Sequence, residues 1–174
     1  MERKIKIYNF LCVIIFILFF GEIKSDNNNE NLDKSYEIHL YFQGKGLQSL
    51  YCDDNIKFFG TENINLYRIK EDGAKININS LLRQDSSHFC KSLIKYNANS
   101  VNEKIIIEFK DNPNTLKQLF LESSIYKIER FDYPFPIDGS DYNEMFYECK
   151  ELTFVDFSNF SFENTTDVSG IFNN

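Results

Sequence analysis

Apolar and polar residues alternate in short runs from about residue 35 onward, and glycine-bearing turns separate these runs. Residues 37–42 and 47–51 are such runs, and Gly44-Lys45-Gly46 lies between them. Alternation places successive side chains on opposite faces of a strand, and glycine suits a tight turn. This pattern predicts a β-hairpin.

A second hairpin is expected where residues 64–69 and 74–79 flank Asp72-Gly73. Glycine accepts a positive φ without steric cost, so Asp-Gly is a strong turn signal. Residues 104–109 then read as a buried strand, because three consecutive isoleucines precede Phe109. Residues 35–110 are therefore expected to form a β-rich domain of hairpins.

The pattern changes after residue 110. Leu119-Phe120, Met145-Phe146 and Ile171-Phe172 recur at intervals of 26 residues. A fixed interval of 20 to 50 residues indicates a repeat in which each unit buries the apolar edge of its neighbour. Residues 111–174 are therefore expected to form a short leucine-rich-repeat-like solenoid. The overall prediction is an α+β chain, with this solenoid following the β-rich domain.

The best-formed unit begins at Met145. Leu152, Val155, Phe157 and Phe160 fit the apolar spacing of a leucine-rich repeat, and Cys149 is expected to pack before them as a small buried thiol. The predicted repeat core consists of Phe120, Phe146, Cys149, Leu152, Val155, Phe157, Phe160 and Phe172.

The preceding unit is less regular. Ile125, Ile128 and Phe131 are its candidate core residues, and a helix is expected to start near Asp111 because Pro113 suits a first turn. Asn174 falls two residues into a third unit, so we expect the solenoid to be truncated and its C-terminal edge to be covered by further repeats or a partner.

The amino end carries Arg3, Lys4 and Lys6, then an uncharged apolar run over residues 10–20. A basic start followed by a short apolar run is typical of a secretory signal, and the run is shorter than the roughly 20 residues of a membrane span. We expect cleavage after Ser25, with an uncleaved N-terminal anchor as the alternative. Residues 26–34 are polar and predict a flexible leader, and no membrane span is expected after the signal is removed.

Removal of residues 1–25 takes away four basic and two acidic side chains, so the net charge falls from −7 to −9. A chain this acidic repels phosphate backbones, which argues against nucleic-acid binding. Cys52, Cys90 and Cys149 remain. An oxidising compartment permits a disulfide, and Cys52–Cys90 is the pairing we favour; three buried free thiols are the alternative.

The residues from Cys149 to Phe160, followed by Thr166, Val168 and Ile171-Phe172, resemble the repeat of BspA-type leucine-rich-repeat surface proteins. In that family the repeat reads C-x-x-L-x-x-L-x-L-S-x-F-x-T-S-x-V-T-x-M-x-x-M-F. Phe162 and Thr165 depart from the pattern. The resemblance implies an exported protein, secreted or on a cell surface, that mediates adhesion and has no shared catalytic residues.

Catalytic, cofactor and metal chemistry have little support. His39 alternates with apolar neighbours and is expected to face solvent. Ser87, His88 and Cys90 lie too close in sequence to indicate a triad, whose members normally come from distant segments. Asp53-Asp54 and residues 138–141 lack the spacing of a calcium loop. No enzyme activity, metal or cofactor is expected.

Two sequons are present, Asn159-Phe160-Ser161 and Asn164-Thr165-Thr166. Asn164 is the preferred glycosylation site, because Asn159 is expected to be partly buried in the repeat turn. The sequence thus predicts an exported glycoprotein that binds an unknown protein or surface ligand. The alternative is a structural fragment of a larger surface protein without binding activity of its own.

Overall fold

The computed structural model describes residues 36–111, 115–132, 142–160 and 170–172, which all belong to one compact unit, Asp33–Asn174. Within these residues, strands alternate with turns, and the only helix is a single 3-10 turn. The elements are β1 (Tyr36–Phe42), β2 (Gly46–Cys52), β3 (Ile64–Ile69), β4 (Lys75–Asn77), η1 (Asn79–Leu81), β5 (Arg83–Asp85), β6 (Leu93–Ala98), β7 (Glu103–Phe109), β8 (Ile125–Phe131) and β9 (Phe154–Val155).

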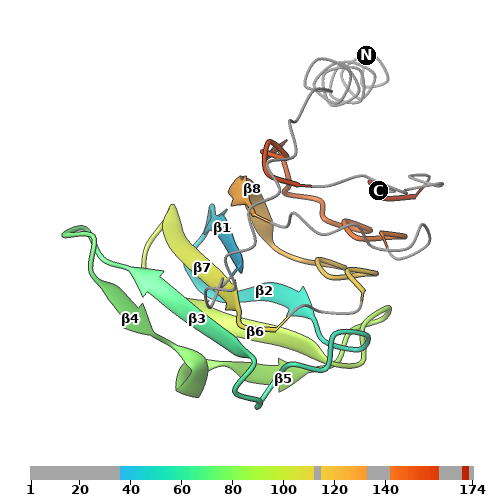
Figure 1. Ribbon diagram of the computed structural model, residues 1–174, viewed down its shortest axis with the longest axis horizontal. Helices are drawn as coiled ribbons and strands as arrows, with labels where there is room; N and C mark the ends of the chain where they lie inside the picture. The colour runs from blue at the N-terminus through green and yellow to red at the C-terminus, as the bar shows by residue number, and fades with distance from the viewer. Residues whose placement is uncertain (1–35, 112–114, 133–141, 161–169, 173–174) are drawn as a thin grey trace, which may run out of the picture. The chain divides into compact units, whose positions relative to one another are not determined.

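The strands form two sheets (Figure 1). The larger has the order β4-β3-β7-β1-β8-β9, and the smaller has the order β2-β6-β5. All observed pairings are antiparallel except the short pairing of β8 with β9, which is parallel.

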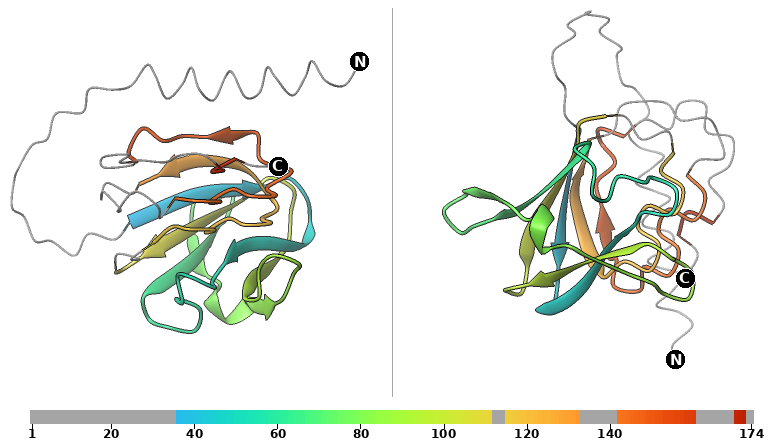
Figure 2. Two further views of the ribbon diagram at one scale, coloured as in Figure 1. Left: turned by 90° about the vertical axis from the view of Figure 1, so that its right-hand side faces the viewer. Right: turned by 90° about the horizontal axis from the view of Figure 1, so that it is seen from below.

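The first expected hairpin is wrong, although both of its strands exist. β1 pairs with β7 and β8 in the larger sheet, whereas β2 pairs with β6 in the smaller one. Residues 43–45 therefore form a corner at which the chain changes sheets, and residues 99–102 form the matching corner between β6 and β7 (Figure 2). Gly46, with φ of +87°, provides the left-handed backbone at the first corner.

The second expected hairpin is present. β3 pairs with β4, with Tyr67 opposite Asn77, and Gly73 turns the chain with φ of +82°. The expected buried strand is also present as β7, which lies between β1 and β3 in the centre of the larger sheet. The residues of the turn were sufficient to predict this hairpin, because its two strands are neighbours in both sequence and space.

One core connects the two sheets. Ile38, Leu40 and Phe42 of β1 point into it, as do alternate residues of β3 and β7 and every third residue of β8. Leu50 and Tyr96 contribute from the smaller sheet, and both are at most 1% exposed. Period-2 alternation along β1 thus directs one set of side chains inward and leaves the other set on the outer face of the larger sheet.

The expected α+β class is wrong, because the described residues contain no α-helix. Of the helix expected near Asp111, residues 117–120 form turns, and residues 112–114 lie outside the described part. The backbone N–H groups of Gln118 and Phe120 bond to the carbonyls of Asn143 and Met145, at 3.1 and 2.8 Å. These bonds run to a distant segment, so the i to i−4 pattern of a helix is not formed.

The separate solenoid is also wrong. β8 pairs with β1, and β9 pairs with β8, so strands from both expected domains lie in the same six-stranded sheet. Ile125, Ile128 and Phe131 are buried, as the spacing indicated, but they pack in the same core cluster as the residues of β1. The repeat residues therefore pack against an existing sheet as well as against one another.

The 26-residue spacing nevertheless has a structural counterpart. The rings of Phe120 and Phe146 are stacked, with centroids 5.4 Å apart and an interplanar angle of 11°. Equivalent turn positions also share left-handed backbone, with φ of 60° at Gln118, 56° at Glu144 and 79° at Gly170. Turns whose equivalent residues are 26 positions apart therefore stack beside the sheets and form part of their common core.

Candidate functional site

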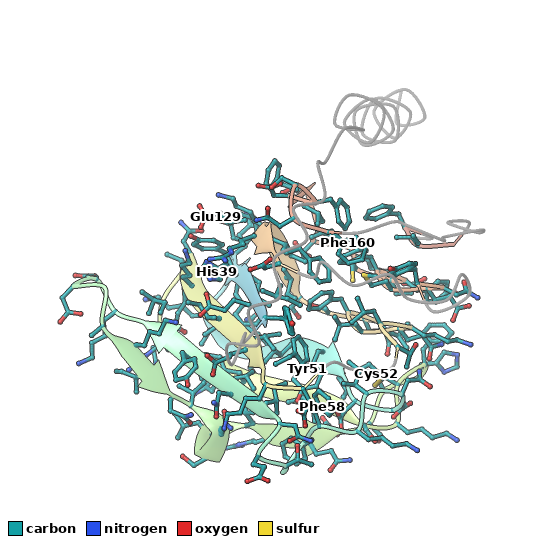
Figure 3. The ribbon with its side chains drawn as sticks, in the orientation of Figure 1. His39, Tyr51, Cys52, Phe58, Glu129 and Phe160 are labelled. Carbon is teal, nitrogen blue, oxygen red and sulfur yellow. A yellow bond between two sulfur atoms is a disulfide. The ribbon has the colours of Figure 1, made fainter. Side chains whose placement is uncertain are left out.

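Polar and aromatic side chains gather on the outer face of the larger sheet, opposite the core. Glu37, His39 and Tyr41 alternate with the buried residues of β1, and side chains of the neighbouring strands join them. Figure 3 shows His39 and Glu129 on the side of the sheet away from Tyr51 and Phe160. We call the following residues the outer face: Glu37, His39, Tyr41, Asn65, Tyr67, Lys75, Lys104, Glu108, Tyr126, Lys127, Glu129, Arg130 and Phe154.

Glu37 is the centre of one charge cluster. Its carboxylate accepts hydrogen bonds from Lys75 Nζ and the His39 ring, each at 2.8 Å, and Arg130 Nη1 lies 3.7 Å away. The three partners come from β4, β1 and β8 respectively. Strands that are distant in the chain thus place their charges on one carboxylate.

Glu129 is the centre of a second cluster. The hydroxyl of Tyr41 donates to its carboxylate at 2.6 Å, and Lys104 Nζ donates at 2.9 Å. Lys104 and Lys127 also lie over the Tyr41 ring, 5.6 and 5.1 Å from its centroid. Hydrogen bonds and cation–π contacts therefore hold the Tyr41 ring in one orientation.

These contacts shift the pKa values of the groups involved. The hydroxyl of Tyr41 and then the ammonium of Lys104 lower the pKa of Glu129 to about 2. Burial, followed by the hydrogen bond to Glu129, raises the pKa of Tyr41. Burial opposes ionisation of Glu37, but hydrogen bonds from Lys75 and His39 outweigh it and lower the pKa of Glu37. Both carboxylates are therefore charged at neutral pH.

His39 differs from the sequence expectation. Its side chain lies on the outer face but keeps only 14% of its surface exposed. Burial lowers the pKa of His39, although Glu37 acts in the opposite direction, and Lys104 and Arg130 lower it further. The imidazole is a packed member of the Glu37 cluster rather than a free surface group.

Aromatic rings give the outer face its apolar component. Tyr41 and Tyr126 pack edge to face with centroids 6.5 Å apart, Lys75 lies over Tyr67, and Lys127 lies over Phe154. Phe154 is 43% exposed. Tyrosines fixed among charges present amphipathic contact area that loses little entropy on binding, as protein-binding surfaces do.

The sequence-predicted site residues lie elsewhere. Cys52 and Cys90 are joined in a disulfide, the pairing that the sequence favoured, and Cys149 is a buried free thiol. Cys149 Sγ donates to the carbonyl of Phe120 at 2.6 Å, and burial raises its pKa to about 12. A neutral, enclosed thiol of this kind is chemically inert.

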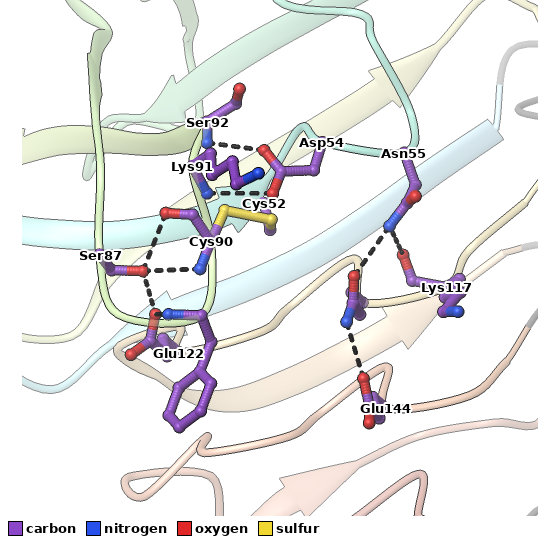
Figure 4. The surroundings of a disulfide bond; sticks show 12 residues. Cys52, Asp54, Asn55, Ser87, Cys90, Lys91, Ser92, Lys117, Glu122 and Glu144 are labelled. Carbon is purple, nitrogen blue, oxygen red and sulfur yellow. Dashed lines mark hydrogen bonds between the residues drawn. A yellow bond between two sulfur atoms is a disulfide. The ribbon is translucent and has the colours of Figure 1, made fainter.

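The disulfide fixes a surface loop (Figure 4). Asp54 accepts the backbone N–H groups of Lys91 and Ser92 at 3.0 and 2.7 Å. The hydroxyl of Ser87 bonds to the carboxylate of Glu122 in the stacked turns. Cys52, Asp54 and Cys90 place potential ligand atoms within 4.8 Å of one another, but disulfide sulfurs are not the thiolates that bind metal ions.

The Ser87, His88 and Cys90 group has no catalytic geometry. Cys90 is bonded to Cys52, so it offers no thiolate. The His88 ring is exposed and packs edge to face on Phe89, with centroids 4.5 Å apart. Ser87 Oγ bonds to the backbone of Cys90 and to Glu122 instead.

The predicted repeat-core residues do lie in the core or against it. Phe120, Phe146, Cys149 and Phe160 are buried, and the other four pack against the cluster: Leu152, Val155, Phe157 and Phe172. Asn159 is exposed rather than partly buried, because it lies in a turn closed by the hydrogen bond from Phe160 N–H to the Phe157 carbonyl. Asn164 and residues 138–141 lie outside the described residues.

Sequence reasoning missed the outer face as a unit. The signal in the sequence is the series Glu37, His39 and Tyr41, which are polar or aromatic at every second position of a strand. Their partners Lys75, Lys104 and Glu129 could be recognised only after the strand order was known, since they come from other strands.

No known family model matches the chain, and no curated protein or solved structure is detectably similar to it. A search of the described residues finds no helix with the length and apolar character to cross a bilayer.

Proposed function

We propose that this chain is an exported protein, secreted or held at a cell surface, that binds another protein through its outer face. The observation that carries the binding proposal is the set of tyrosines fixed among paired charges, above all Tyr41 between Glu129, Lys104 and Lys127. Rigid amphipathic rings with a polar surround are typical of the centres of protein–protein interfaces.

Export is supported by two independent features. The amino end has the three-part pattern of a secretory signal. The buried Cys52–Cys90 disulfide would persist in an oxidising compartment and be rare in a reducing cytosol. The resemblance of residues 149–172 to BspA-type surface proteins favours the same location and an adhesive role.

Site-resolved crosslinking tests the binding proposal. A photo-reactive amino acid replaces Arg130 or Phe154, which are well exposed on the outer face. The protein is then expressed in its native cells, so that its natural partners are present during crosslinking. The matched control places the same group at Leu81, which is 54% exposed on η1. We expect a discrete protein adduct from positions 130 and 154 and none from position 81.

Tyr41→Phe and Tyr41→Ala make the test specific. The first keeps the ring and removes the hydrogen bond to Glu129, while the second removes the ring. Adduct formation should fall strongly with Tyr41→Ala. Equal adducts from all positions, or none from the outer face, would favour the alternative of a structural component without binding activity. Recovery of the product inside the cell with Met1 intact would contradict export.

A further inference from the structure

The turn that follows β9 presents an asparagine side chain to solvent. Residues 157–160 form this turn, which is closed by the hydrogen bond from the Phe160 N–H to the Phe157 carbonyl at 3.0 Å. Asn159 lies at the exposed tip of the turn. Its side-chain amide makes no hydrogen bond to the described residues. The amide nitrogen is therefore accessible from outside the folded protein.

Contacts with the core hold both ends of the turn. The Phe160 side chain is 4% exposed, and its ring lies among the core side chains, 4.8 Å from the ring of Phe131 between centroids (Figure 3). At the other end, the Asp156 N–H donates to the carbonyl of Ile128 in β8 at 2.9 Å. The backbone is thus fixed on either side of Asn159 while its side chain stays outside the core. A bulky group attached to that side chain would displace no core residue.

Asn159 is also the first residue of the sequon Asn159-Phe160-Ser161. This motif is the acceptor for N-linked glycosylation, which adds a large hydrophilic group to surface asparagines of exported proteins. Partial burial was the reason to prefer the sequon at Asn164, and the exposed position of Asn159 removes that reason. Ser161 and Asn164 lie outside the described residues, so the accessibility observed in the structure concerns Asn159 alone.

We propose that Asn159 carries an N-linked glycan. The transfer joins the side-chain nitrogen of Asn159 to the first sugar carbon of a lipid-linked oligosaccharide diphosphate. The bond from that carbon to the diphosphate breaks, the lipid diphosphate leaves, and the amide gives up one proton to the transferase. Because this reaction takes place in the secretory pathway, the site rests on the export part of the proposed function. It does not depend on protein binding by the outer face.

The test is expression of the full chain in cells whose secretory pathway transfers N-glycans, followed by analysis of the protein in the medium. A peptide N-glycosidase in heavy-oxygen water converts each glycosylated asparagine to a labelled aspartate, which mass spectrometry locates. We expect the label at position 159 in most of the secreted molecules. Ser161→Ala should abolish that label, because it removes the hydroxyl group of the sequon, whereas Ser161→Thr should retain it.

Asn164→Gln is the matched control, since it removes the neighbouring sequon and should leave the label at position 159 unchanged. Asn159→Gln should unfold at the same temperature as the unchanged protein after glycan removal, because the side chain that it replaces is exposed. Secreted protein without the label at position 159 overturns this proposal and leaves export intact. Protein retained inside the cell with Met1 intact overturns both. A label that survives Ser161→Ala would reveal spontaneous deamidation, and it also overturns the proposal.

Discussion

The ring of Phe172 lies parallel to that of Phe146, with an interplanar angle of 4° and centroids 5.1 Å apart. Phe146 is stacked in the same way on Phe120, so one ring lies between two others spaced 26 residues apart on either side. The backbone follows the rings, since Phe146 N–H donates to the Ile171 carbonyl at 2.9 Å. The stacked rings and the backbone hydrogen bonds therefore fix the same alignment of each turn on the next.

Phe146→Ala should destabilise the protein by about 3 to 5 kcal/mol, because it removes a fully buried ring and leaves a cavity between two others. Phe146→Leu should cost less, since it keeps much of the apolar volume. Denaturant unfolding measures both changes. Phe89→Ala, at a ring that is 44% exposed, is the control and should cost well under half as much. Equal losses at positions 89 and 146 would show that the stack has no special part in stability.

The disulfide should contribute about 3 to 4 kcal/mol, because Cys52 and Cys90 are 38 residues apart and closing such a loop restricts the unfolded chain. Replacing both cysteines with serine should lower the free energy of unfolding by that amount. A reductant should destabilise the unchanged protein to a similar extent and should leave the double variant unaffected. Sensitivity of the double variant to reductant would contradict this assignment, since Cys149 is then the only cysteine beyond the leader.

The corner at Gly46 can be tested by a matched pair of glycine substitutions. Gly46 has φ of +87° and open space where a Cβ would lie, so Gly46→Ala should cost about 1 to 2 kcal/mol through backbone strain alone. Gly44 is two residues away without a positive φ, and its added Cβ would meet only the end of the flexible Gln48 side chain at 3.4 Å. Gly44→Ala should therefore change the melting temperature by less than Gly46→Ala does, and the reverse order would refute the strained corner.

The corner also shows which parts of the fold the sequence could predict. The β3–β4 hairpin, strand β7 and the 26-residue spacing follow from residues close together in the chain or from a simple period. Gly44-Lys45-Gly46 suits a hairpin turn and a sheet-changing corner equally well, because both need a left-handed residue. The choice between them depends on the pairing of β1 with β7, which is a long-range interaction.

The repeat pattern did not predict the correct fold of the C-terminal part, for a related reason. The spacing of Leu152, Val155 and Phe157 correctly indicated residues that pack against the core, but it could not identify what they pack against. An existing sheet offers the edge of β8, and β9 joins it as a parallel strand. The outer face was missed because the partners of Glu37 and Glu129 come from four strands, β1, β4, β7 and β8, which meet only in the folded sheet.

The Glu129 cluster predicts a pH-dependent contribution to stability. Its pKa is about 2 in the folded state and close to its ordinary value of 4.5 in the unfolded chain. A carboxyl group with a lowered pKa stabilises the fold above the unfolded pKa, and this contribution is lost as the pH falls from about 4.5 to about 2. The Glu129 side chain is 41% exposed, so solvent screening limits the effect to less than about 1 kcal/mol.

Unfolding free energies of the unchanged protein and Glu129→Gln, measured at intervals from pH 7 to pH 2, test this expectation. The unchanged protein should be the more stable at pH 7, and the difference should shrink as the pH falls below about 4.5. Tyr41→Phe removes the hydroxyl that contributes most to the shift, so the difference between Glu and Gln at neutral pH should be smaller in that background. A difference that stays constant with pH, or that is the same with and without the Tyr41 hydroxyl, would show that Glu129 does not hold the outer face together through its charge.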